Sequence, residues 1–404
     1  MGPRAGRARL RTLSMVFLCG LAGCQHAGGP GREAPVVQLD TRRTTNPDVA
    51  VNNLHAAIDS LRARLALTPD DTTLSAALAD QLLARAAYLG SYDDFREVDE
   101  LTARAYAHSE TTPSVIMQRA GYLSAVHRFV EASELIDLAE RHGAEAGEVE
   151  RARIVIGVAT GTAPALLLPR AEALVAESDT YARLTVLGTV QAAGGHYDEA
   201  DATYLRALER YRDVSPFALA WVSFTRGVMW GEAAGRPDIA RVLYRDAVAR
   251  LPQYVVANVH LSELEDSAAA IPRLEGIAYV AGDPEPAGRL AQRLEDSDPD
   301  RAADLRQRGT ERYDELLARH REAFLDHGAE FFAGVGGDPQ RALALALENV
   351  ALRPVPRAYV VAIGAALEAD ALDTACALVA QSARWRGQHV VLEERAAELS
   401  RRCP

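Results

Sequence analysis

The sequence contains no lysine, so all 44 of its basic residues are arginine. This absence excludes a P-loop, whose Lys contacts the phosphates, and a protein kinase, whose strand Lys binds ATP. It also excludes an enzyme that forms a Schiff base through an amine side chain. Aromatic residues are scarce at 6 %, whereas Ala is abundant. Small side chains let helix axes approach closely, so the composition favours packed helices over a β-sandwich.

The arginines are outnumbered by 56 acidic residues, which gives a formal net charge of −12. Residues 1–23 carry four arginines and no acid, so their removal would leave 40 basic and 56 acidic residues, a net charge of −16. A body this acidic is repelled by nucleic-acid phosphates and by anionic lipid head groups. We therefore expect no nucleic-acid partner for the folded part of the chain.

Residues 1–23 have the order of a signal peptide, with four arginines before an apolar run too short to span a bilayer. The following stretch, Leu21-Ala22-Gly23-Cys24, resembles the lipobox of bacterial lipoproteins. The resemblance implies that Cys24 becomes the mature N-terminus and carries acyl chains such as palmitate. Gln25, rather than Asp, then implies the periplasmic side of the outer membrane. The alternative is a soluble secreted protein in which Cys24 is incidental.

Residues 24–47 are rich in Gly, Pro and polar side chains and lack an apolar period. Such a composition is typical of a flexible linker. We therefore expect a tether between the membrane anchor and the folded part.

Beyond the tether the sequence repeats itself, as in "GGHYDEADATYLRALERY" (194–211) and "GRPDIARVLYRDAVARLP" (235–252). Small or apolar marker residues recur every 33 or 34 positions, with one step of 40 and a gap before Ala342. These markers are Val98, Ala132, Leu166, Ala200, Ala240, Ala342 and Ala375. Five positions before each marker stands a residue suited to a turn. These turn residues are Asp93, His127, Gly161, Gly195, Gly235, Gly337 and Asp370.

A 34-residue period with helix–turn–helix content resembles the tetratricopeptide repeat. The fullest match has Leu184, Leu187, Gly188, Ala200, Tyr204 and Ala207, and the next unit repeats its second half as Ala240, Tyr244 and Ala247. The resemblance implies an all-α, right-handed superhelical solenoid of helical hairpins. Physically, Gly188 and Ala200 let two helices touch, and Tyr204 fills the space beside them. The alternative is an ordinary helical bundle with accidental periodicity.

The period divides the folded part into three segments. Residues 48–251 form an N-terminal repeat array, and residues 336–404 contain further repeats with a closing helix. Residues 252–335 depart from the spacing, and we interpret them as a bend, a partner site or a drifted pair of repeats.

The resemblance also implies that the first helix of each hairpin lines a concave groove. Matching the repeats places Met117, Thr185, Thr189, Thr225 and Met229 there. Chaperone-binding members of the family hold a peptide carboxylate with a Lys/Asn/Arg clamp, which a chain without lysine lacks. The groove therefore suits a neutral peptide or a helix.

Two clusters suggest metal binding but lack the required pattern. Residues 295–300, "EDSDPD", have calcium-loop spacing, but Arg301 and Gln307 replace the Gly and Glu of such a loop, so we expect a helix cap. His320, Phe324, His327 and Phe331 would share one helical face, and Glu330 would be a third zinc ligand. Because the chain has no HExxH or CxxC motif, we interpret this stripe as packing.

The sequence thus predicts a lipid-anchored scaffold that binds another protein or peptide of the cell envelope. No catalytic residue, metal or cofactor is expected. The alternative is an enzyme or a small-ligand or metal-binding protein with its site in residues 252–335. That alternative predicts that a ligand stabilises the protein against heat. It also predicts that this stabilisation is lost when His320 or His327 is replaced.

Cys376 and Cys403 are predicted to form a disulfide. Cys19 leaves with the signal peptide and Cys24 is acylated, so these two cysteines remain in an oxidising compartment. They meet if the last two helices are antiparallel around a turn at residues 386–387. The alternative is a pair of free thiols. A disulfide that closes a loop of roughly thirty residues stabilises the fold by about 3 kcal/mol.

We expect thiol titration of the mature, denatured and unreduced chain to detect no free thiol. Two reactive thiols per chain would refute the disulfide. The reduced chain, with two thiols, is the control.

Overall fold

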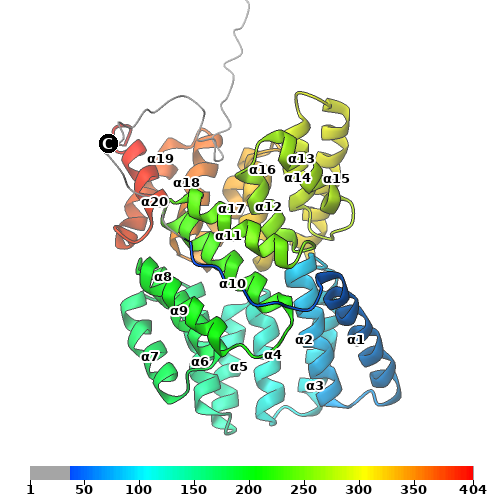
Figure 1. Ribbon diagram of the computed structural model, residues 1–404. Helices are drawn as coiled ribbons and strands as arrows, with labels where there is room; N and C mark the ends of the chain where they lie inside the picture. The colour runs from blue at the N-terminus through cyan, green and yellow to red at the C-terminus, as the bar shows by residue number, and fades with distance from the viewer. Residues whose placement is uncertain (1–36, 404) are drawn as a thin grey trace, which may run out of the picture. The chain divides into compact units, whose positions relative to one another are not determined.

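The computed structural model describes residues 37–403, and within them the chain forms helices and no strand (Figure 1). A leading helix α1 (Pro47–Leu67) precedes nine hairpins of consecutive helices, and α20 (Val390–Leu399) follows them. The paired helices are α2 (Thr72–Leu89) and α3 (Asp94–His108), α4 (Pro113–Ala125) and α5 (Phe129–Arg141), α6 (Ala146–Ala159) and α7 (Pro164–Glu177), α8 (Tyr181–Ala193) and α9 (Tyr197–Arg210), α10 (Pro216–Val228) and α11 (Pro237–Arg250), α12 (Val255–Glu263) and α13 (Ser267–Ala278), α14 (Glu285–Leu294) and α15 (Pro299–Arg319), α16 (Leu325–Ala333) and α17 (Pro339–Leu352), α18 (Pro356–Glu368) and α19 (Leu372–Gln381). The predicted all-α, right-handed solenoid of hairpins is confirmed.

In seven of the nine described hairpins, one residue of the turn adopts a left-handed conformation. Six of the seven predicted turn residues have positive φ, from 56° at Asp370 to 81° at Gly195. Asp93 is the exception, with φ −62°, and Gly90, with φ 67°, takes its place at the end of α2. Glycine is favoured here because it has no Cβ to oppose positive φ.

The marker residues lie where the two helices of a hairpin touch. Six of the seven have no exposed surface, whereas Leu166 is 64 % exposed. In that hairpin the loop is one residue longer, since α7 begins three residues after Gly161 and α9 begins two residues after Gly195. The marker therefore shifts by one position, and Leu167 packs against Gly157 instead.

A glycine of the first helix faces a buried tyrosine of the second helix in two neighbouring hairpins. A Cβ on Gly188 would lie 3.0 Å from the Tyr204 ring, and Ala200 and Ala207 are fully buried around this contact. In the next hairpin, a Cβ on Gly227 would lie 2.5 Å from the Tyr244 ring. Tyr244 is buried there together with Ala240 and Ala247.

The solenoid makes contact with itself after one superhelical turn. Hydrogen bonds connect residues 191–195 positions apart at successive places along the chain: Tyr92 with Asp283, His127 with Glu322, Ala159 with Arg353, and Tyr197 with Gln388. The first member of each pair lies in or beside a hairpin turn. The row of turns therefore packs on the next superhelical turn. At Gly161 a Cβ would come within 2.8 Å of the Pro354 carbonyl oxygen.

Residues 37–46, expected to belong to the flexible tether, lie against the repeats instead. This is the dark blue segment that crosses α10 in Figure 1. Arg226, which is 1 % exposed, donates to the Gln38 carbonyl and pairs with both carboxylate oxygens of Asp201 at 2.8 Å. Thr45 N–H donates to the Val214 carbonyl at 2.7 Å.

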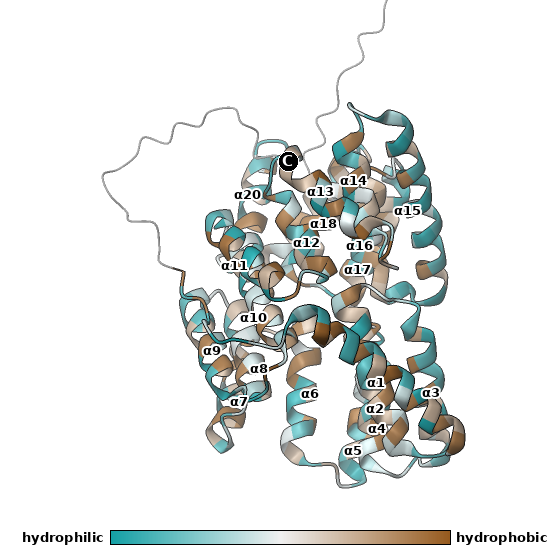
Figure 2. Ribbon diagram, turned by 45° about the vertical axis from the view of Figure 1, so that its right-hand side comes forward, coloured by the Kyte–Doolittle hydropathy of each residue, from teal (hydrophilic) through white to brown (hydrophobic). Residues whose placement is uncertain are grey.

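Residues 252–335, which depart from the sequence period, continue the stack of hairpins. Helices α12 to α16 pack consecutively on one another, and α15 is longer than its partner α14. Figure 2 shows α15 mostly teal, because one side of this long helix is exposed and charged. Its apolar side, with Leu305 and Tyr313, is buried.

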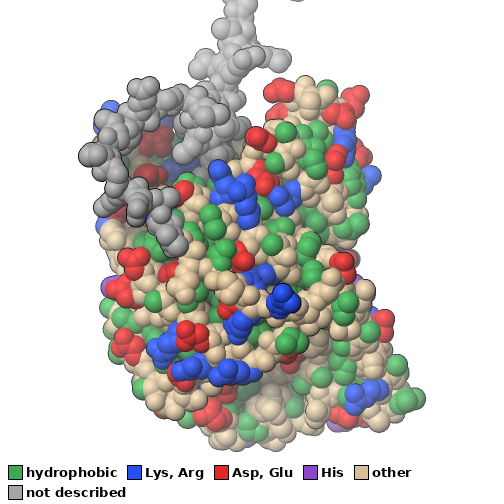
Figure 3. All heavy atoms as spheres, in the orientation of Figure 1, with side chains coloured by type: hydrophobic (Ala, Val, Ile, Leu, Met, Phe, Trp, Pro, Cys, Tyr) green, Lys and Arg blue, Asp and Glu red, His purple; other side chains and the backbone are tan. Residues whose placement is uncertain are grey.

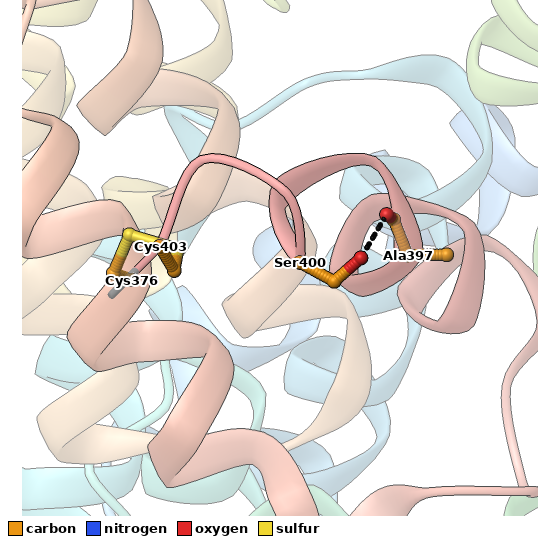
Figure 4. The surroundings of a disulfide bond; sticks show 4 residues. All are labelled: Cys376, Ala397, Ser400 and Cys403. Carbon is orange, nitrogen blue, oxygen red and sulfur yellow. Dashed lines mark hydrogen bonds between the residues drawn. A yellow bond between two sulfur atoms is a disulfide. The ribbon is translucent and has the colours of Figure 1, made fainter.

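The closing helix is held by the predicted disulfide. Cys376 of α19 and Cys403 after α20 are bonded, with an S–S distance of 2.01 Å (Figure 4). The Cys403 side chain packs against the largest apolar cluster. Helix α20 thus covers the last described hairpin, where it packs against α18.

Cys24, Gln25 and the predicted signal peptide lie outside the described residues. Within residues 37–403, every helix is too short or too polar to cross a membrane.

We expect Gly227→Ala to destabilise the chain by about 1–3 kcal/mol, because the new methyl overlaps the Tyr244 ring in a full core. Urea unfolding followed by circular dichroism measures the difference. Gly121→Ala in α4 is the matched control, since nothing lies within 4 Å of its Cβ. The control should be neutral or stabilising by up to about 1 kcal/mol. Equal effects in the two variants would contradict the close helix contact.

Candidate functional site

The first helices of the C-terminal hairpins bring charged side chains of both signs together. The π-helical segment η1 (Met229–Ala233), which follows α10, and the first helices α12, α14, α16 and α18 each contribute at least one of them. We call this group the inner charge cluster; it consists of Glu232, His260, Glu263, Glu285, Arg289, His327, Glu330 and Arg357. The side chains are 12–35 % exposed, so solvent reaches them although most of their surface is covered.

Arg357 connects two acids from different hairpins. Its Nη1 lies 2.6 Å from Oε2 of Glu232, and its Nη2 lies 3.1 Å from Oε2 of Glu330. Glu232 also pairs with His260, whose Nδ1 lies 3.2 Å from Oε1 of Glu232. The guanidinium of Arg357, on α18, therefore links η1 to α16.

Arg289 has the same role in the other half of the cluster. Its Nη2 lies 2.8 Å from Glu263 of α12 and 3.2 Å from Glu285 at the start of its own helix. Oε2 of Glu285 then faces Nδ1 of His327 at 3.4 Å. Nδ1 of His260 lies 3.8 Å from Oε2 of Glu263, which joins the two halves into one network through η1, α12, α14, α16 and α18.

The network strongly shifts the pKa values of two of its members, Glu232 and His327. Burial raises the pKa of Glu232, but Arg357 and His260 outweigh burial and hold this pKa at about 2. Burial lowers the pKa of His327, but Asp326 and Glu285 act more strongly and raise it to about 10. Neighbouring opposite charges therefore keep Glu232 negatively charged and His327 positively charged at neutral pH.

Local backbone structure positions two of the acids. Glu232 lies in a five-residue π-helical segment, η1 (Met229–Ala233), which extends α10. Single π-helical turns interrupt α-helices frequently at functional sites. Glu285 is the first residue of α14, where the positive end of the helix dipole favours a carboxylate.

None of the five groove residues expected from the repeat spacing is a member of this cluster, although Met229 lies in the same segment as Glu232. Met229 is buried in an apolar cluster with Tyr204, and Met117 packs against the largest core. The Thr185 hydroxyl donates to the Ala182 carbonyl, and the Thr189 hydroxyl donates to the Thr185 carbonyl.

Thr225 is half-buried on α10. Apart from Glu232, the charged members of the inner face lie in or beyond residues 252–335. There the sequence period is lost, so spacing could not assign their register. The pairs His260–Glu263 and His327–Glu330, each three residues apart, are the signal that the sequence offered.

His320 and His327 do not share a helical face. Helix α15 ends at Arg319, a 3-10 turn (η2, Arg321–Phe324) follows, and α16 begins at Leu325. The condition for the predicted stripe, a continuous helix, is therefore not met. His320 packs edge-on against Phe95, whereas His327 and Glu330 belong to the inner charge cluster.

Asp298 caps α15 in the way the "EDSDPD" stretch suggested. Its Oδ1 accepts from the Arg301 backbone N–H at 3.3 Å. The acids of this stretch thus lie at the positive end of a long helix.

Outside the cluster, acidic and basic side chains alternate over the surface. Figure 3 shows blue and red groups next to one another on the face toward the viewer. Many are ion pairs between neighbouring helices, such as Arg321 with Glu348. Such exposed pairs contribute little to stability.

The hairpins and their buried glycine–tyrosine contacts define the protein as a tetratricopeptide-like solenoid. No family model matches the sequence, and no curated protein does either. Among solved structures, a Rap protein in complex with competence and sporulation factor is 14 % identical, with a TM-score of 0.43 over 76 % of this chain and 96 % of that one. Yeast Tom70 is 13 % identical, with a TM-score of 0.35 over 88 % and 94 %. The P58(IPK) TPR domain is 15 % identical, with a TM-score of 0.29 over 87 % and 94 %.

We expect Arg357→Met to destabilise the chain by about 1–3 kcal/mol at pH 7, because Glu232 and Glu330 lose a shared partner in a partly buried site. Urea unfolding at pH 7 gives the difference from the parent chain. Arg321→Met removes an exposed pair and is the control, with an expected change below about 0.5 kcal/mol.

The pH dependence separates lost charge pairing from lost packing. Arg357 depresses the pKa of Glu232, so the stabilisation is present above the ordinary value of 4.5 and is lost as the pH falls toward about 2. The deficit of Arg357→Met should therefore shrink as the pH falls through this window. A deficit that is constant with pH would point to packing alone.

Proposed function

We propose that this chain is a lipid-anchored scaffold that binds another protein of the cell envelope along the inner face of its solenoid. The inner charge cluster is the observation that supports this proposal most. A stack of hairpins offers a long concave surface for a partner, and here that surface bears partly exposed charges of both signs.

The cluster suits a role in selecting the partner. Its acids and arginines already pair with one another, so an added charge gains little unless it replaces an existing partner. A partner segment must therefore present charges in matching order, and a wrong order leaves ions unpaired. The acidic body favours a protein over a nucleic acid as this partner.

Membrane attachment through Cys24 would hold the scaffold on the periplasmic side of the outer membrane. The lipobox-like sequence supports this part of the proposal, together with the signal peptide before it. Of the predicted tether, residues 37–46 pack on the repeats, and residues 24–36 lie outside the described part of the chain.

Site-specific photocrosslinking in intact cells tests partner binding. We expect p-benzoylphenylalanine in place of Glu263, on the inner face, to trap one discrete protein. The same residue in place of Asp304, which is 57 % exposed on α15, is the control and should trap little. Mass spectrometry identifies the trapped band.

Failure to crosslink from Glu263, or equal crosslinking from both positions, would contradict an inner-face partner site. The Cys24→Ser variant tests the anchor separately. We expect it to move from the membrane fraction to the soluble fraction; retention in the membrane would refute acylation at Cys24.

A further inference from the structure

Three metal-binding side chains converge at one end of the inner charge cluster. A donor atom of Glu285, one of His327 and one of Glu330 all lie within 4.8 Å of one another. His327 and Glu330 are three residues apart on α16, which places them on one face of that helix. Glu285 reaches the same point from the start of α14.

The spacing of these donors fits a small cation. Nδ1 of His327 lies 3.4 Å from Oε2 of Glu285. Zinc bonds of 2.0–2.2 Å at tetrahedral angles place two ligand atoms about 3.3 Å apart. An N–H···O bond to a carboxylate is shorter, about 2.7–2.9 Å. The Nδ1 atom is enclosed and makes no hydrogen bond of ordinary geometry.

Two arginines orient the carboxylates without using all of their oxygens. Arg289 contacts Oε1 of Glu285, and Oε2 faces His327. Arg357 contacts Oε2 of Glu330, which leaves Oε1 for another bond. Metal sites commonly hold their ligands through such outer contacts.

We propose that Glu285, His327 and Glu330 form a Zn²⁺ site on the inner face of the solenoid. One imidazole and two carboxylates suit zinc, whereas Ca²⁺ takes oxygen ligands. His327, which is protonated in the metal-free chain, releases its Nδ1 proton to solvent when the cation binds. Three protein ligands leave a fourth position for water or a partner side chain. The His327 side chain is 35 % exposed, so the cation reaches the site from solvent.

This site differs from the one that the sequence suggested. Spacing paired His327 with His320, but the break between α15 and α16 separates them. Glu285, 42 positions before His327, takes the place of His320 beside His327 and Glu330. His320 therefore serves as a matched control, since it is a histidine of the same region outside the trio.

Equilibrium dialysis against ZnCl₂, with metal analysis of the chelator-treated chain, tests the proposal. We expect one Zn²⁺ per chain in the parent and in His320→Gln. We expect His327→Gln and Glu330→Gln to lose this binding, and Arg357→Met to weaken it about 10- to 100-fold. Zinc should also raise the thermal midpoint of the parent and of His320→Gln only.

Circular dichroism establishes that each variant is folded. If His327→Gln does not fold, zinc binding by Glu330→Gln and Glu285→Gln tests the site instead. Absence of stoichiometric zinc in the parent would overturn the site. Zinc binding that persists in His327→Gln, or that is lost in His320→Gln, would also overturn the site. None of these outcomes changes the result expected for crosslinking from Glu263. The metal site and the partner site are therefore tested independently.

Discussion

The close approach of two helices through a glycine and a buried tyrosine is the contact on which the rest of the structure depends. Gly188 against Tyr204 and Gly227 against Tyr244 show it most clearly. Small residues let the helix axes approach closely at these points. Four other hairpins place a buried Val98, Ala132, Ala342 or Ala375 at the same marker position, and repetition of this packing produces the stack.

A regular superhelix brings distant parts of the chain together at a constant separation. Residues 191–195 positions apart meet from Tyr92 to Tyr197, so the turns of the four hairpins from α2–α3 to α8–α9 contact the later part of the solenoid. These contacts give the turn residues a second role, which Gly161 shows, since it needs both positive φ and space for the Pro354 carbonyl. A solenoid that contacts itself is stiffer than an open array, because opening it breaks contacts beyond nearest neighbours.

The stacking of the hairpins also brings charges of both signs together in the inner charge cluster. The first helices meet there, and the side chains of the cluster keep only 12–35 % of their surface exposed. Charges in such a place must be paired, which Arg289 and Arg357 achieve by each joining two acids. The proposed protein partner and the proposed cation are two ligands that such a preorganised polar surface suits.

The sequence by itself determined the helical hairpins, their turns and the residues that pack within each one. A 34-residue period fixes these features because they arise from contacts between residues less than about 20 positions apart, such as Gly188 with Tyr204. Even the shift from Leu166 to Leu167 follows from one extra loop residue. Only the tertiary structure decided the inner charge cluster, since its members come from five segments between residues 232 and 357. Their meeting depends on the accumulated rotation of the stack, and where the period is lost in residues 252–335, spacing alone cannot give that rotation.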